Sequence, residues 1–213
     1  ICSGGLLIIL AMRSATARHR RRRLIWEGGG LAVPDKPAGV PTAATRETDR
    51  GTLEAWVRSR FGGRPHLPQR LDRRASGLLL VVVDPSLNRP IAEALAERRI
   101  TRIYRATVVA DPLDDSCRLV GTVGGKHAAL TYRRLAAGEL EVTLETGRTH
   151  QIRRQLADIG CPLVGDPRYG GTPGPLGLRA ARLVFDHPRT GQTIDLNVPR
   201  FGDDAGPAAS GDQ

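Results

Sequence analysis

A single carboxylate lies among arginines just before an apolar run. Residues 69–77 read QRLDRRASG, and residues 78–83 read LLLVVV. Three arginines surround Asp72 in this stretch: Arg70, Arg73 and Arg74. An apolar run of this length is typical of a strand that is buried on both faces. A loop joined to such a strand can present a reactive group, although most aspartates beside arginines form surface ion pairs. Residues 69–77 alone therefore leave both roles open for Asp72.

A second stretch with chemical potential is residues 145–156, ETGRTHQIRRQL. Thr149 is expected to cap a helix over residues 149–159, and Arg148 and Arg153 then lie near its start. Free backbone N–H groups at the start of a helix attract anions, so this place could hold a phosphate or a carboxylate such as Asp72. An ordinary helix cap with surface arginines would give the same pattern.

The composition points to a basic protein with a polyanionic partner. The 213 residues carry a formal charge of +10 and have a pI of about 10.8. Nucleic acid is a better candidate partner than a membrane surface, although an Arg-rich coding bias would produce the same excess. The three cysteines and five histidines are scattered, which predicts a reducing, cytoplasmic environment and no metal site.

The length and the ends of the chain predict one folded domain, residues 28–201, with two appendages. Residues 1–27 are expected to form a flexible basic extension, whose arm at residues 18–23 is a candidate RNA contact. Because the sole methionine is Met12, residues 1–11 are interpreted as not native. Residues 202–213 are predicted to be a disordered tail. The apolar segment at residues 6–10 is too short to span a membrane, so no membrane association is expected.

The hydrophobic patterns predict more strands than helices. Helices are expected from Thr52, over residues 85–99 and over residues 149–159, and residues 163–177 are expected to form an ordered loop. Strands are predicted at residues 78–83, 100–110, 128–135, 140–144, 182–185 and 193–198. The predicted fold class is therefore α+β, with a mixed, largely antiparallel sheet and flanking helices.

Four blocks of the chain, in this order, resemble the RluA-type pseudouridine synthases, which isomerise uridine in ribosomal and transfer RNA. DKPAG at residues 35–39 resembles the family's D-K-P-x-G motif, and RLD at 70–72 with SGLL at 76–79 resembles its H-R-L-D-x-x-T-S-G-L-L signature. RIY at residues 102–104 resembles K-x-Y. TGRTHQIR at 146–153, with Gly160 and GDPRYG at 165–170, resembles T-G-R-T-H-Q-I-R followed by G-x-P-x-x-G-D-x-x-Y-G. The resemblance covers residues 28–200.

This resemblance implies a role for each matching residue. Asp72 is expected to be the catalytic carboxylate, and Tyr104 to line the pocket and stack on the target uracil. Arg153 is expected to pair with Asp72 and to hold it ionised. Arg70 is expected to fill the gap that the displaced base leaves in the RNA, since an arginine plane can replace part of the lost stacking. Tyr104 also fits a purely structural role as a core aromatic residue of a strand.

The remaining matching residues are expected to support the site or to contact the RNA backbone. They are Lys36, Arg148, His150 and Gln151, and Arg73 and Arg74 are expected to meet phosphate or solvent. The implied isomerisation needs no metal and no cofactor. A monomer with RNA as its partner is expected. A non-catalytic RNA-binding or ribosome-assembly factor on the same scaffold is the alternative, and it would not need the intact set of Asp72, Tyr104 and Arg153.

The chain departs from the family's pattern at a few positions. Gln69 replaces the usual His, and Ala75 replaces the usual Thr of the Asp72 block. Arg102 stands for Lys in K-x-Y, Ala110 for a Gly and Cys161 for a frequent His. None of these changes removes a residue with an implied catalytic role. Gln69 and Ala75 are expected to affect how firmly the loop aims Asp72.

Overall fold

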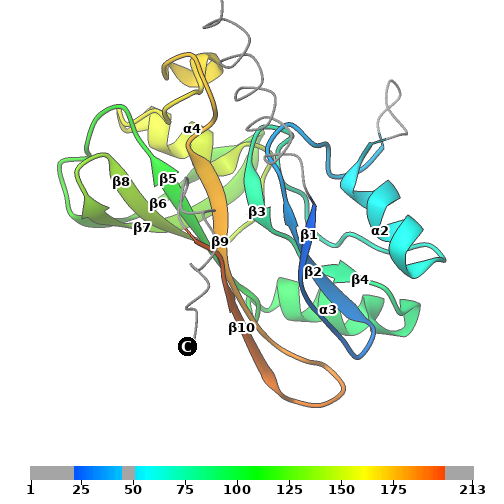
Figure 1. The fold of residues 1–213 in the computed structure, drawn as a ribbon. Helices are drawn as coiled ribbons and strands as arrows, with labels where there is room; N and C mark the ends of the chain where they lie inside the picture. The colour runs from blue at the N-terminus through cyan, green and yellow to red at the C-terminus, as the bar shows by residue number, and fades with distance from the viewer. Residues whose placement is uncertain (1–21, 45–50, 200–213) are drawn as a thin grey trace, which may run out of the picture. The chain divides into compact units, whose positions relative to one another are not determined.

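The computed structural model describes residues 22–44 and 51–199, which divide into two compact units, residues 1–93 and 94–213. The predictions for residues 1–11, for most of the arm at 18–23 and for the tail at 202–213 lie outside the described residues. The α+β fold class is confirmed: every strand pairing within each unit is antiparallel, and helices flank the strands (Figure 1). No helix of the described residues is long and apolar enough to cross a membrane.

The first unit is built on a small antiparallel sheet with two helices. Its elements are β1 Arg23–Gly28, β2 Leu31–Lys36, α2 Leu53–Phe61, β3 Ser76–Leu78, β4 Val81–Val82, the 3-10 turn Pro85–Leu87 and the greater part of α3 Asn88–Ala96, whose last three residues belong to the second unit. Strand β2 lies between β1 on one side and β3 and β4 on the other. The expectation of a flexible extension up to residue 27 is wrong for residues 23–27, because they form β1.

The apolar run at residues 78–83 is buried as predicted, but it does not form one continuous strand. Strands β3 and β4 pair with β2 in a single register, in which Leu78 lies opposite Asp35 and Val81 lies opposite Ala32. The interruption falls opposite Pro34, which has no backbone N–H to donate across the ladder. One bond survives there, from the Leu79 N–H to the Pro34 carbonyl at 3.2 Å. A proline of the partner strand therefore divides the run.

Helix α2 begins where the sequence predicts. Thr52 is its N-cap, and the Thr52 hydroxyl oxygen accepts a hydrogen bond from the Ala55 N–H at 3.0 Å. Leu53 and Val57 are fully buried, whereas Trp56 is only half-buried. The cap and the apolar face act together to fix this helix.

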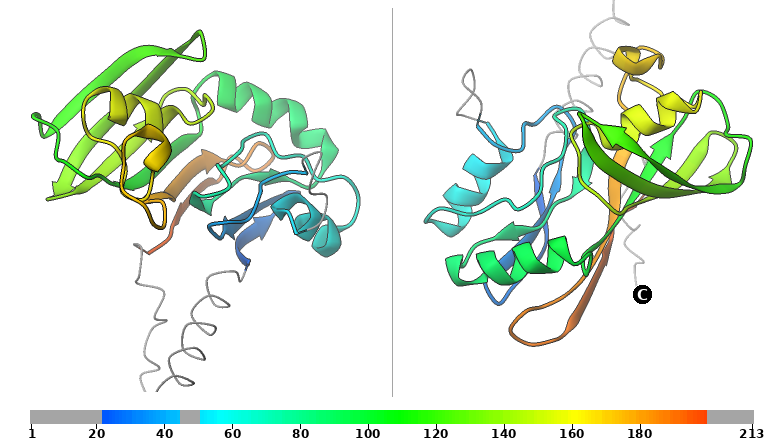
Figure 2. Two further views of the ribbon diagram at one scale, coloured as in Figure 1. Left: turned by 90° about the horizontal axis from the view of Figure 1, so that it is seen from above. Right: turned by 180° about the vertical axis from the view of Figure 1, so that it is seen from behind.

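The second unit contains the longer sheet. Its elements are β5 Thr101–Thr107, β6 Ser116–Val123, β7 Lys126–Ala136, β8 Glu139–Leu144, α4 Gln151–Asp158, the 3-10 turn Pro167–Tyr169, β9 Leu178–Asp186 and β10 Thr193–Asn197. The strands follow the order β10-β9-β5-β8-β7-β6. Helix α4 lies against this sheet (Figure 2). Leu130, Leu140 and Leu156 are completely buried in its core.

Strand β6 has no counterpart among the predicted strands. It lies at the edge of the sheet, paired with β7 alone, and Val123 is its only buried residue. An edge strand that faces solvent on most positions has little need of apolar residues, so its hydrophobic pattern is weak. The central strands β5, β7, β8 and β9 were predicted because their buried residues are regular.

Candidate functional site

Lys36 holds the loop that carries Asp72. Its side chain is fully buried, and its ammonium group donates to backbone carbonyls of two segments. The acceptors are Ala75 at 2.6 Å, Val40 at 2.9 Å, Pro37 at 3.2 Å and Arg73 at 3.3 Å. Three ammonium protons are thus shared among four carbonyls, which ties residues 37–40 to residues 73–75. Because Lys36 is buried, the structure favours the first of its two expected roles, support of the site, over a contact with RNA.

Further hydrogen bonds fix the backbone on both sides of Asp72. The Thr42 hydroxyl donates to the Leu71 carbonyl at 2.7 Å, and the Leu71 N–H donates back to the Thr42 hydroxyl oxygen at 3.2 Å. The Gly39 N–H donates to the Arg73 carbonyl at 2.7 Å. A bond from the Ala75 N–H to the Asp72 carbonyl, at 3.1 Å, closes a tight turn. The loop is therefore rigid, and the side chain of Asp72 remains half-buried rather than enclosed.

The charge of Lys36 is coupled to this loop. Burial lowers the pKa of Lys36 from 10.5 to about 8, while the carboxylates of Asp72 and Asp35 act in the opposite direction. An ammonium group with four carbonyl acceptors is a fixed positive charge near Asp72.

The lowered pKa of Lys36 should make the free energy of unfolding depend on pH. Between pH 8 and 10.5 the unfolded chain binds more protons at Lys36 than the folded chain, so this residue makes stability rise with pH in that window. Relative to Lys36→Met, the wild-type free energy of unfolding should increase by about 2 kcal/mol from pH 7.5 to 9.5. Urea denaturation of both proteins at the two pH values measures this. Equal changes in the two proteins would show that the folded pKa of Lys36 is not lowered.

The three arginines of the Asp72 block differ in their surroundings. Arg70 is exposed. Arg73 is also exposed, but its Nε donates to the Gly39 carbonyl at 3.1 Å, so it helps to join the two loops. Arg74 is half-buried. The expectation that Arg73 meets only phosphate or solvent is therefore wrong, whereas the proposed insertion of Arg70 into RNA stays a prediction.

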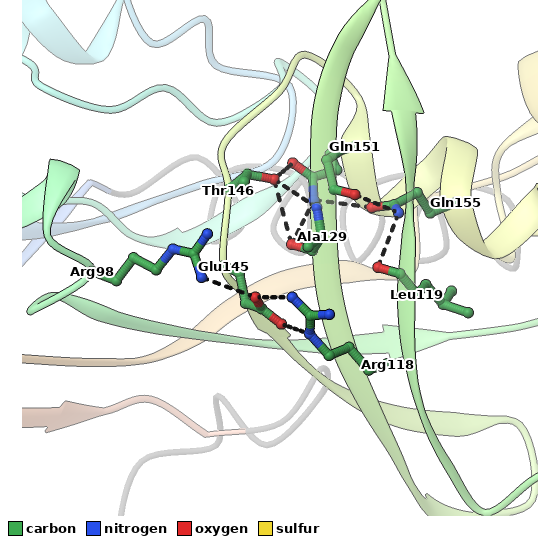
Figure 3. Close-up of polar contacts among 9 residues, drawn as sticks. Arg98, Arg118, Leu119, Ala129, Glu145, Thr146, Gln151 and Gln155 are labelled. Atoms are coloured by element: carbon green, nitrogen blue, oxygen red, sulfur yellow. Dashed lines mark hydrogen bonds and ion pairs between the residues drawn. The ribbon is translucent and has the colours of Figure 1, made fainter.

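In the second unit, Gln151 organises the start of α4. Its Oε1 accepts from the Thr146 hydroxyl at 2.7 Å and from the Arg148 N–H at 3.0 Å. Its Nε2 donates to the Ala129 carbonyl on β7 at 3.0 Å and to Gln155 Oε1 at 2.9 Å (Figure 3). Gln151 is buried, which favours the first of its two expected roles, support of the site, over a contact with RNA. Its side chain fixes the backbone at Arg148.

The helix starts two residues later than predicted, and Thr149 is not its cap. The N-cap is His150, which has φ 57° and makes no side-chain capping bond. A left-handed conformation costs a residue with a side chain about 1–2 kcal/mol. Nδ1 of His150 lies 2.8 Å from the Tyr169 hydroxyl, and this bond helps to hold the histidine in place. An RNA contact by His150 stays a prediction.

Arg153 has a buried acidic partner, Asp166, that the sequence motifs do not predict. Its Nε and Nη2 donate to the two carboxylate oxygens of Asp166 at 2.7 and 2.8 Å, and both side chains are buried. The Arg153 guanidinium also lies over the Tyr169 ring, 4.9 Å from its centroid. Asp166 and Tyr169 belong to the GDPRYG block. The signal was present in the sequence, but neither residue could be given a partner from spacing alone.

The residues with implied catalytic roles are divided between the two units. Asp72 belongs to the first unit, and Tyr104 and Arg153 belong to the second. Tyr104 is 7% exposed on the central strand β5, between β8 and β9. The predicted ion pair between Asp72 and Arg153 and the pocket role of Tyr104 stay predictions.

The guanidinium group of Arg148 is anchored at one of its nitrogen atoms. Its Nε donates to the His127 carbonyl at 2.8 Å. Within residues 22–44 and 51–199, no acceptor is paired with its two terminal nitrogens. Such a guanidinium is oriented in advance for an anion.

Comparison with known proteins shows which family the chain is similar to. Residues 30–158 match the family model for RNA pseudouridylate synthases. An uncharacterized RNA pseudouridine synthase of Chloroflexus aurantiacus is 36% identical over 78% of this chain and 61% of its own length. The ribosomal large subunit pseudouridine synthase D of Pseudomonas aeruginosa is 31% identical over 92% of this chain and 75% of its own length. The solved structure of human RNA Pseudouridylate Synthase Domain Containing 1 has a TM-score of 0.69 at 20% identity, covering 85% of this chain and 84% of that chain.

The matched region includes both the Asp72 loop and all of α4. The chain spans only 61% of the Chloroflexus protein and 57% of the ribosomal large subunit pseudouridine synthase D of Neisseria meningitidis. The match to the family model nevertheless extends over more than half of this chain. The chain therefore belongs to the RNA pseudouridylate synthase family, and within it to the RluA type.

Proposed function

We propose that this protein converts uridine to pseudouridine in RNA, with Asp72 as the catalytic carboxylate. The observation that carries the proposal is the loop around Asp72. Lys36, Thr42 and Gly39 fix its backbone, yet the Asp72 side chain stays half-buried. A binding protein has no need to hold one carboxylate so firmly. Preorganisation of this kind is what a reacting group requires.

The proposed reaction is an isomerisation within one nucleotide. The bond between N1 of uracil and C1′ of ribose breaks, and a bond between C5 of uracil and C1′ forms. C5 loses its proton and N1 gains one, so no atom is added overall. The target base must first leave its stack, which costs a few kcal/mol, and we propose that Arg70 occupies the place it leaves. The carboxylate of Asp72 then acts beside the flipped nucleotide.

We assign supporting roles to residues of the second unit. Asp166 accepts hydrogen bonds from Nε and Nη2 of Arg153, which fixes the orientation of the guanidinium. We propose that Nη1 of Arg153 pairs with the carboxylate of Asp72. A cation at this place keeps a carboxylate ionised at neutral pH. Tyr104 is proposed to stack on the uracil, and Arg148 and His150 to contact the RNA backbone.

The names of several relatives indicate the substrate class. The synthases from Neisseria meningitidis and Pseudomonas aeruginosa are named for the large ribosomal subunit. Large-subunit ribosomal RNA is therefore the proposed substrate, with transfer RNA as the second candidate. We further propose that the protein acts as a monomer in the cytoplasm, where these RNAs are located.

Incubation with transcribed large-subunit ribosomal RNA and with transfer RNA, followed by nucleotide-resolution mapping of pseudouridine, tests the proposal. New pseudouridine at defined uridines is expected. If RNA from the source organism is bound but never modified, the chain is instead a binding or ribosome-assembly factor on a synthase scaffold.

A further inference from the structure

Arg102 is one of the arginines of the second unit that form no ion pair with a carboxylate among the described residues. Eight other arginines of this unit have acidic partners: Arg98, Arg99, Arg105, Arg118, Arg133, Arg134, Arg153 and Arg182. Figure 3 shows two of them, Arg98 and Arg118, converging on Glu145. Arg102 is half-buried, and its Nε is buried without a hydrogen-bond acceptor in the described part of the chain. A guanidinium with unmatched donors is ready for a ligand that supplies acceptors.

Gly147 leaves the space in which this guanidinium lies. A Cβ atom at position 147 would stand 3.1 Å from Nη1 of Arg102. That distance is tighter than ordinary van der Waals contact, so the arginine would have to move by a few tenths of an ångström. The backbone of Gly147 is not left-handed, and so its conformation does not demand glycine. The close approach of Arg102 disfavours a side chain at this position. Gly147 itself is exposed, which places the guanidinium beside the solvent.

Two neighbouring features indicate what the ligand is. Arg102 is two residues from Tyr104 on β5, so both side chains leave the same face of the sheet. Arg148, the residue after Gly147, is held by the His127 carbonyl and has further N–H groups to offer. An arginine fork beside a second arginine matches the oxygens of a phosphate better than an uncharged base edge.

We propose that Arg102 binds a backbone phosphate of the RNA substrate, next to the place where Tyr104 receives the target base. This inference rests on the proposed function, and it adds a phosphate contact to that site. Backbone contacts fix the register of a nucleic acid without reading its sequence. Arg102 therefore sets which nucleotide is presented to Tyr104.

The test is a salt titration of RNA affinity with matched variants. Binding of transcribed large-subunit ribosomal RNA is measured over a series of KCl concentrations for wild type, Arg102→Gln, Arg102→Lys and Arg99→Gln. Arg102→Gln should bind about tenfold more weakly at low salt. Its slope of log affinity against log salt should be shallower by about 0.7–0.9, the value of one phosphate. Arg102→Lys keeps the charge and should keep the slope.

Arg99→Gln is the control for general loss of charge. Arg99 lies three residues before Arg102, is exposed, and is paired with Glu97. Its replacement should leave the slope unchanged. A wild-type slope in Arg102→Gln, or an equal change of slope in both Gln variants, overturns the proposal. Wild-type protein that binds this RNA but makes no pseudouridine would contradict the proposed function, while the slopes would still decide whether Arg102 contacts phosphate.

Gly147→Ala gives an independent readout if Arg102→Gln does not fold. The added methyl group displaces the guanidinium of Arg102. In a protein that keeps Arg102, the affinity for RNA should therefore fall by about threefold, which is less than the effect of Arg102→Gln. In the Arg102→Lys variant there is no guanidinium group for the methyl group to displace. Gly147→Ala should then leave the affinity for RNA unchanged. An equal effect in both backgrounds would show that Gly147 does not act through Arg102, and it would count against the phosphate site.

Discussion

Replacement of Asp72 by Asn should abolish isomerisation while RNA affinity stays within about twofold of wild type. Asn has nearly the same shape as Asp, so the loop held by Lys36 and Thr42 keeps its structure. Asn cannot carry the negative charge that the reaction needs. Loss of a central catalytic group typically lowers kcat by about 10⁴-fold or more. Pseudouridine formed per RNA under single-turnover conditions, together with the Kd, measures both quantities.

Asp84→Asn is the matched control for this experiment. Asp84 lies in the same unit and caps the 3-10 turn, where its side chain accepts from the Ser86 N–H at 2.9 Å. Asn is an equally good cap, so both stability and turnover should be preserved. Measurable turnover by the Asp72 variant above about 1% of wild type would refute the role of Asp72. An equal loss in both variants would attribute the effect to folding.

The second large effect is expected at Asp166. Asp166→Ala leaves the Arg153 guanidinium buried without its acidic partner, which typically costs about 3–5 kcal/mol. Urea denaturation should show this loss. Asp195→Ala removes the partner of Arg182 in an exposed pair, and it should cost about 1 kcal/mol or less. A loss below about 1 kcal/mol for Asp166→Ala would mean that the pair does not organise this region.

A double variant separates the structural role of this pair from its role in the reaction. Arg153→Met combined with Asp166→Leu replaces two buried charges by apolar groups of similar size. Replacement of this kind is often neutral for stability, so most of the loss should be recovered. Turnover should remain low, because the cation proposed to serve Asp72 is gone. Recovery of turnover along with stability would show that Arg153 has only a structural role.

The local elements could be predicted from the sequence wherever burial is regular. Thr52 begins α2, and the run at residues 78–83 is buried, because caps and apolar patterns are local signals. The division of that run into β3 and β4 was not predictable from residues 78–83, because its cause is Pro34 on another strand. Strand β6 was missed since an edge strand that faces solvent has no strong apolar pattern.

The site illustrates the same limit for polar residues. The motifs identified Lys36 and Gln151, but a sequence does not say whether a polar side chain faces solvent or a set of buried carbonyls. Both proved to be buried hydrogen-bonding residues. The partner of Arg153 is Asp166, thirteen residues away on a loop whose path no pattern specifies. The motifs therefore located the important residues, and the fold was needed to show which groups each of them contacts.

A pseudouridine map of RNA from cells tests the central claim most directly. A strain that lacks this gene is complemented with wild type or with the Asp72→Asn variant, and pseudouridine is mapped at nucleotide resolution in ribosomal and transfer RNA. One uridine or a small set should lose the modification in the deletion strain and regain it only with wild type. Restoration by the Asp72→Asn variant, or identical maps in all strains, would contradict the assignment of Asp72 as the catalytic carboxylate of an RNA pseudouridine synthase.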